Sequence, residues 1–132
     1  MCGFFIAMNN VFWLRFVALS GALSVLLGAF AAHGLEGQLS DRYMDTFRTA
    51  VLYQFLHTLA LLAVISLPDQ RATASLCSWA AISFALGILL FSGSLYLLVL
   101  ADIPAMGMVT PVGGLAFIVG WALLFFAARR AQ

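Results

Sequence analysis

The stretch TAVLYQFLHTLALLAVISL, from Thr49 to Leu67, is long, apolar and free of formal charge. An α-helix rises about 1.5 Å per residue, so about 20 residues cross a hydrocarbon core of about 30 Å. The stretch is therefore predicted to be a membrane-spanning helix. Its middle nonetheless holds three hydrogen-bonding side chains, Tyr53, Gln54 and His57, which are costly to expose to lipid.

The rest of the chain has the same character. Of its 132 residues, 64% are hydrophobic and only 8% are charged, whereas about a quarter of a soluble domain is charged. The apolar runs do not alternate with polar residues, which favours helices over a β-barrel. We predict an all-α integral membrane protein with one transmembrane domain over residues 1–132, a compact antiparallel bundle of four helices. The spans are predicted at about 12–33, 49–67, 74–100 and 105–128.

Two alternatives concern the N-terminal part of the chain. Arg15, the apolar stretch that follows it and the small residues Ala29, Ala31 and Ala32 resemble a cleavable export signal. The stretch is a little long for a signal, so a first membrane span is preferred. Translation could begin at Met1 or at Met8, in which case residues 1–7 are an extension at the membrane interface.

The basic residues predict the orientation. Four spans place Arg15, Arg71, Arg129 and Arg130 on one side, and Arg42 and Arg48 on the other. Because basic residues accumulate on the cytoplasmic side, both termini are predicted to be cytoplasmic. Cys2 and Cys77 would then face the reducing side, and no disulfide is expected. The net charge of +1 gives no indication of a nucleic-acid surface.

Small residues recur at helical spacing and predict close helix packing. Ser20, Ser24, Gly28 and Ala32 follow one another at intervals of four in the first span. Similar positions are Ser83 and Gly87 in the third span, and Gly113, Gly114, Ala116 and Gly120 in the fourth. These ridges could pack the bundle or serve self-association, and the sequence does not separate the two uses.

The connections carry helix signals of their own. Ser40 is a plausible N-cap for an amphipathic helix over Asp41–Arg48 (a segment of about 40–48), resting on the outer membrane face or running straight into the second span. Thr110 and Pro111 fit the N-cap and first position of the fourth helix, with residues 105–109 at the interface. The alternative is one longer helix from Ala105, kinked at Pro111.

The polar residues of the spans predict one cluster in the outer half of the bundle. Tyr53 and His57 lie four residues apart on one helix face, with Gln54 three residues before His57. Neighbouring helices offer Ser92, Ser94, Tyr96 and Thr110. Two interpretations stay open: a structural cluster that fixes helix register, or a site that handles a proton or a ligand.

The second histidine, His33, lies at the outer end of the first span and is predicted to cap that helix together with Gly34. Two histidines without a nearby cysteine fall short of a dedicated metal site, so neither a metal nor a cofactor is expected. We find no nucleophile motif or phosphate-binding loop, because Gly113 and Gly114 lie inside a membrane helix without a following lysine.

Five short motifs in order resemble the YgdD family, small four-helix membrane proteins of unknown function. They are GAFAAHGL at 28–35, YQFLH at 53–57, FSGSLY at 91–96, TPVGG at 110–114 and GW at 120–121. The family usually has glycine where this chain has Ala32, a small departure that keeps helix packing plausible. The resemblance implies four spans and a location in the bacterial inner membrane, and it brings no reaction, substrate or catalytic residue.

Two hypotheses of function follow. The first is a non-enzymatic accessory or scaffold protein that resides in the lipid bilayer and joins a larger membrane complex. The alternative is a homo-oligomeric transporter or a bundle that binds a small ligand or lipid through the Tyr/Gln/His/Ser cluster.

Overall fold

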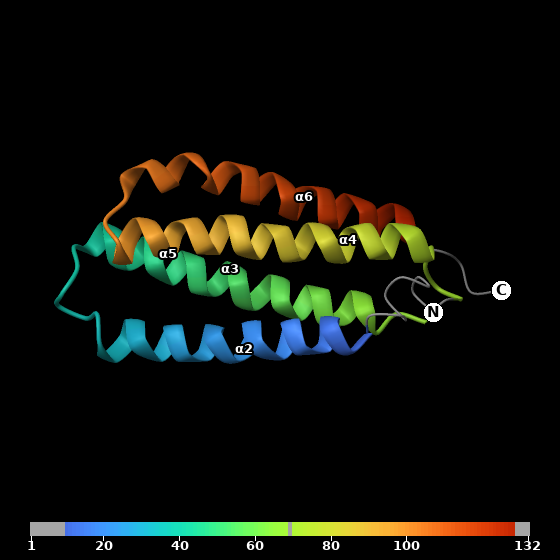
Figure 1. The fold of residues 1–132 in the computed structure, drawn as a ribbon, viewed down its shortest axis with the longest axis horizontal. Helices are drawn as coiled ribbons and strands as arrows, with labels where there is room; N and C mark the ends of the chain where they lie inside the picture. The colour runs from blue at the N-terminus through green and yellow to red at the C-terminus, as the bar shows by residue number, and fades with distance from the viewer. Residues whose placement is uncertain (1–9, 69, 129–132) are drawn as a thin grey trace.

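The computed structural model describes residues 10–68 and 70–128, and in these residues four helices are long and apolar enough to cross a membrane. They cover Asn10–His33, Asp41–Ile65, Ala74–Leu100 and Pro104–Ala127. Successive spans run in opposite directions and lie side by side as one elongated bundle (Figure 1). The predicted class, an all-α membrane protein with four spans, is confirmed.

Two of the spans are divided into shorter elements. The first two spans are single helices, α2 (Asn10–His33) and α3 (Asp41–Ile65). The third consists of α4 (Ala74–Gly87), a π-helical turn η1 (Ile88–Ser92) and α5 (Gly93–Leu100). The fourth consists of a 3₁₀ turn η2 (Pro104–Met108) and α6 (Thr110–Ala127).

The helices pack as two close pairs that are joined through α3. One pair is α4 with α6 and the other is α2 with α3, while α3 also contacts α4, η1 and α5. α3 is therefore the central helix, and α2 lies at the edge with α3 as its main neighbour (Figure 1). Large apolar side chains such as Leu26 (65% exposed) and Phe125 (77% exposed) cover the outside. Such a surface suits a hydrocarbon environment, since soluble proteins rarely expose large apolar patches.

The predicted amphipathic segment is the beginning of α3 and not a separate helix. Ser40 is the N-cap, and its Oγ accepts a hydrogen bond of 3.3 Å from the backbone N–H of Tyr43. The helix then continues without a break from Asp41 to Ile65. No glycine or proline interrupts this range, so the segment runs straight into the second span, as one of the two alternatives stated.

The last connection follows the late-start alternative, with one correction. Asp102 adopts φ +52° where the chain reverses after α5, and the 3₁₀ turn η2 precedes α6. α6 begins at Thr110, its N-cap is Val109, and no side chain caps it. Thr110 was predicted to be the N-cap, and that prediction is wrong. Its hydroxyl lies instead 2.7 Å from Ser94 Oγ on α5.

Glycine allows α6 to lie directly against the third span. A Cβ placed on Gly113 would lie 2.2 Å from the backbone N of Phe91, inside the π-helical turn. Cβ atoms on Gly87 and Gly120 would meet the rings of Phe117 and Phe84 at 2.3 and 2.7 Å. Gly114 has ordinary space, with its nearest neighbour at 3.8 Å. Three of the predicted packing glycines thus lie where the helices meet most closely.

The small residues of α2 are only partly used for packing. Ser20 and Ser24 are buried, and a Cβ on Gly28 would lie 3.5 Å from Val51 of α3. Ala32 is exposed, and Ala31 is the residue buried in the core at that end. In the other spans, Ser83 and Ala116 are half-buried.

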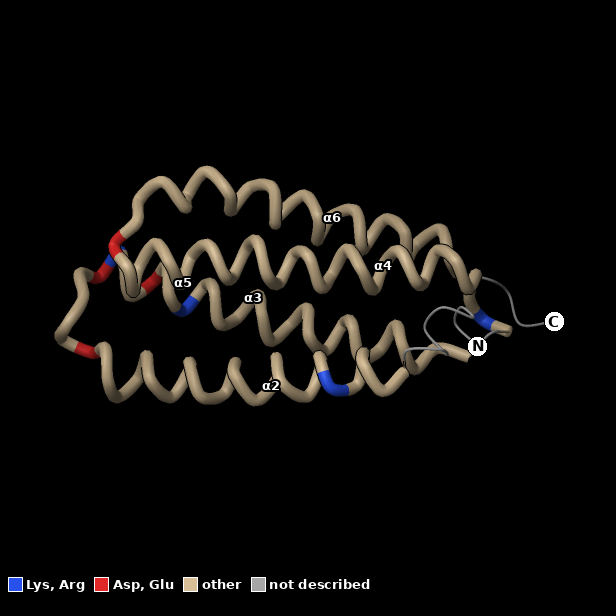
Figure 2. The backbone as a smooth tube through the Cα atoms, viewed as in Figure 1, with Lys and Arg blue, Asp and Glu red and all other residues tan. Residues whose placement is uncertain are grey.

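The charges gather at the two ends of the bundle (Figure 2). One end holds the acidic residues and two arginines at and before the start of α3 and after α5: Glu36, Asp41, Arg42, Asp45, Arg48 and Asp102. Arg71 lies in the connection between α3 and α4 at the opposite end, and Arg15 lies in the second turn of α2. Met8, Cys2, Arg129 and Arg130 lie outside the described residues.

Candidate functional site

His57 of α3 is buried and held by both ring nitrogens. Its Nδ1 lies 2.8 Å from the carbonyl oxygen of Tyr53, and the indole N–H of Trp121 on α6 donates to Nε2 at 3.2 Å. A carbonyl can only accept and an indole N–H can only donate. This pairing therefore assigns the proton to Nδ1 and leaves the ring neutral.

Aromatic rings surround this histidine on the side of α4 and α6. The ring of Phe117 stacks on it with centroids 3.5 Å apart and planes 12° apart, and Phe84 and Trp121 approach it at an angle. Tyr53 is 39% exposed and stacks on Phe91 at 4.7 Å. Its hydroxyl has no hydrogen bond to any other described residue. The site thus joins α3 to α6 chiefly by aromatic packing.

Gln54 belongs to a second, separate network that joins three helices. Its Nε2 donates to the carbonyl oxygen of Ser20 at 3.1 Å and lies 3.3 Å from Ser20 Oγ. Tyr96 of α5 donates its hydroxyl to Gln54 Oε1 at 2.6 Å. Ser20 Oγ also lies 2.7 Å from Thr58 Oγ1, and Thr58 in turn donates to the Gln54 carbonyl. Gln54 is therefore the junction between α2, α3 and α5.

The predicted serines and threonine form further local contacts. Ser92, in the π-helical turn, donates to the carbonyl oxygen of Ala50 at 2.8 Å and so ties the third span to α3. Ser94 pairs with Thr110 between α5 and α6. Ser24 donates to the Ser20 carbonyl within its own helix. Each hydroxyl is thus satisfied where it stands.

The polar residues of the predicted cluster do not gather around the His57 ring. No side chain of Tyr53, Gln54, Ser92, Ser94 or Tyr96 bonds to the His57 ring. Residues three apart on a helix differ by about 60° in direction, because each residue turns the helix by about 100°. Gln54 consequently reaches α2 and α5, whereas His57 reaches α4 and α6.

His33 was predicted to cap α2, but its ring does not bond to the last carbonyl groups of that helix. The backbone N–H groups of Gly34 and Leu35 both bond to the carbonyl of Phe30, at 2.7 and 3.1 Å. The His33 ring makes no hydrogen bond within residues 10–68 and 70–128. A Cβ on Gly34 would lie 2.6 Å from the Phe30 ring, so a larger residue there would require that ring to move.

The part of the chain that the structure describes contains few potential metal ligands close to one another. Within it, no three His, Cys, Asp or Glu side chains come together in a way that could hold a metal ion. Cys77 is buried in the hydrophobic core beside α6. The described residues therefore offer hydrogen bonds and aromatic contacts rather than ligands for an ion.

The chain is similar to known membrane proteins of unknown function. A model of the family described as "protein of unknown function (DUF423)" matches residues 27–114. The UPF0382 inner membrane protein YgdD of Escherichia coli is 42% identical over 125 residues, covering 95% of each chain. This chain belongs to the DUF423 (UPF0382) family. The predicted resemblance is thereby confirmed.

Other members of the DUF423 family are equally similar. The UPF0382 membrane protein YwdK of Bacillus subtilis is 42% identical over 113 residues, covering 86% of this chain and 92% of its own. The UPF0382 membrane protein SAB0533 of Staphylococcus aureus is 44% identical over 113 residues, covering 86% of this chain and 91% of its own. No solved structure matches the chain. The names of these DUF423 relatives place them in membranes and indicate no enzymatic activity.

Proposed function

We propose that this DUF423 protein is a non-catalytic accessory or scaffold unit of the bacterial inner membrane. The observation that carries the proposal is the complete pairing of His57, whose two ring nitrogens are engaged by Tyr53 and Trp121. A histidine that exchanges a proton with a ligand must have a ring nitrogen within hydrogen-bond reach of that ligand. Here the ring is used to hold α3 and α6 together, as expected of a structural residue.

The alternative, an oligomeric transporter or ligand-binding bundle built on the polar cluster, has less support. Its proposed lining residues face different helices and bond to one another or to backbone carbonyls. Two separate surface cavities contain some of them. One is lined by residues of α3, η1, α5 and α6 and includes Thr110, and the other is lined by residues of η1, α5 and η2 and includes Ser94 and Tyr96. Neither cavity is lined by His57. The cluster residues therefore do not share one opening in this arrangement.

The first prediction separates these two functions. His57→Leu is expected to lower the free energy of unfolding by about 1 kcal/mol, because interhelical hydrogen bonds in membranes contribute about that much. His57→Gln keeps an amide that can accept from Trp121 and is expected to stay within about 0.5 kcal/mol of the parent. Thermal unfolding in detergent measures both.

Equal destabilisation by the two variants would contradict the structural role. If His57→Gln accumulated and unfolded like the parent but lost a pH-dependent flux in proteoliposomes, the transporter alternative would be correct. Both variants are therefore assayed for stability and for flux.

An accessory protein must also bind a partner protein in the membrane. We expect gentle extraction from native membranes, followed by native mass spectrometry, to retain a larger protein at fixed stoichiometry. A homo-oligomer alone, holding a small molecule, would instead favour the alternative.

We also propose that both termini face the cytoplasm. Arg71 lies in the connection between α3 and α4, which is at the end of the bundle where α2 begins and α6 ends (Figure 1), and basic residues favour the cytoplasmic side. Green fluorescent protein fused after residue 132 is expected to fluoresce, and alkaline phosphatase at the same place to be inactive. Phosphatase inserted at Gly37, in the opposite loop, is expected to be active. The reverse pattern would show the opposite orientation.

A further inference from the structure

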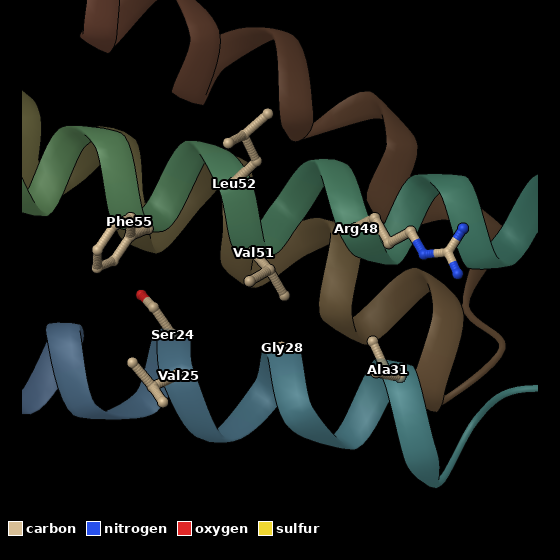
Figure 3. Close-up of a pocket in the computed structure, with 9 residues that line it drawn as sticks. Ser24, Val25, Gly28, Ala31, Arg48, Val51, Leu52 and Phe55 are labelled. Atoms are coloured by element: carbon tan, nitrogen blue, oxygen red, sulfur yellow. The ribbon is translucent and has the colours of Figure 1, made fainter.

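An apolar groove runs between α2 and α3 on the outside of the bundle (Figure 3). It encloses about 360 Å³ and is lined on α2 by Gly28, Ala31 and Ala32. Val51 and Phe55 line the α3 side. The groove exists because the small residues of α2 leave a space that larger side chains would fill. A space beside lipid is filled by lipid, since an empty cavity forfeits dispersion contacts.

One basic side chain, Arg48, lines this groove. It extends along α3 toward the beginning of that helix, away from Val51 (Figure 3). Arg48 lies seven residues after Asp41, or about 10 Å along the helix. A long basic side chain at that depth reaches toward the interface, where lipid headgroups lie.

The guanidinium of Arg48 is available to an anion. Its only charged neighbour among the described residues is Asp45, at 3.9 Å, and both side chains are largely exposed, 59% and 79%. Exposed pairs of this kind contribute little. Arg48 makes no hydrogen bond to a described residue, so its planar donor fork is free to bind a phosphate by two parallel bonds.

We propose that this groove binds one anionic phospholipid, with an acyl chain between α2 and α3 and the phosphate on Arg48. The charge of Arg48 favours this occupant over a second copy of the chain. In a two-fold dimer through this face the same patch meets itself, which would bring two like guanidinium groups toward each other. The inference is independent of the role proposed for His57.

The charge is tested with matched arginine variants. The full chain is purified in detergent containing equal amounts of phosphatidylglycerol and phosphatidylcholine, and bound lipid is counted by native mass spectrometry. The parent is expected to retain one phosphatidylglycerol per chain. Arg48→Gln is expected to lose about tenfold in phosphatidylglycerol occupancy, down to the level of phosphatidylcholine. Arg42→Gln, on the same helix but lining a different cavity, is the control and is expected to behave like the parent.

The groove itself is tested by filling it. A Cβ on Gly28 would lie at an ordinary 3.5 Å from Val51, so Gly28→Leu is expected to fold and to occupy the groove with its side chain. It should abolish retention of both lipids. Gly93→Leu adds the same bulk where a Cβ meets nothing within 4 Å, and is expected to retain the lipid.

Two results would overturn the proposal. If Arg48→Gln and Arg42→Gln lost phosphatidylglycerol equally, the lipid would be held by the general charge of the surface and not by a site at Arg48. A lipid-free dimer that Gly28→Leu dissociates would show that a second copy occupies the groove. Melting temperatures in detergent are recorded for each variant, and if Gly28→Leu fails to fold, the arginine pair alone decides.

Discussion

Gly113→Ala is expected to destabilise the bundle by about 3 kcal/mol, at the upper end of the cost of overpacking a well-packed interior. The added Cβ would lie 2.2 Å from the backbone N and 2.7 Å from the Cα of Phe91. Backbone atoms inside a helix cannot rotate away as a side chain can, so α6 must move off the π-helical turn. Thermal or denaturant unfolding in detergent measures the loss.

Gly114→Ala is the matched control for this prediction. The same methyl group one residue later would meet only the Phe91 ring, at 3.8 Å, which is an ordinary contact. A change within about 0.5 kcal/mol is expected. If both variants lost stability equally, the loss could not come from the contact with the Phe91 backbone, and the close approach of α6 at Gly113 would be wrong.

Gln54→Leu is expected to cost about 2 kcal/mol, the second largest effect. The variant removes the bonds to Ser20 and leaves the Tyr96 hydroxyl without its acceptor, and an unsatisfied buried group costs about 1–3 kcal/mol. Because the amide joins α2 and α5 to α3, the loss should appear as lower unfolding cooperativity as well as a lower midpoint. Circular dichroism in detergent follows both.

The neighbouring residue supplies the control. Tyr53→Phe removes a hydroxyl that bonds to no other described residue and keeps the ring that stacks on Phe91. Its stability should match that of the parent. A cost for Tyr53→Phe as large as that for Gln54→Leu would show that the polar contacts of α3 are not arranged as described.

The spans could be predicted because their signal is local. A run such as Thr49–Leu67 has no charge, and length alone then requires a membrane helix. The π-helical turn Ile88–Ser92 was not predicted, since ILLFS is as apolar as the sequence on either side. The turn lies where Gly113 of α6 comes close to the backbone of Phe91, and the pattern of a single helix does not contain that contact.

The polar residues show the same division between local and tertiary information. Their types and depths could be predicted, and both Gln54 and His57 are buried. Their partners could not, because a small difference in helical direction selects a different neighbour. Trp121 lies in the GW motif and Thr58 lies four residues after Gln54, but their positions in the sequence do not show which side chains they contact. A wheel of α3 drawn with the other helices around it would have separated the two faces.

The junction at Gln54 also has a consequence for the order in which the protein is made. Its amide oxygen bonds to Tyr96, which lies 42 residues later in the chain. At about 5–20 residues per second, ribosomal synthesis takes about 2–8 s to cover that distance. The first helical hairpin is complete once Ile65 has been made, well before Tyr96, so for most of this interval the amide oxygen of Gln54 lacks its donor. The hairpin of α2 and α3 is therefore expected to stay in contact with water or the insertion machinery until the third span has been made. The first two spans and the third span would then enter the membrane together.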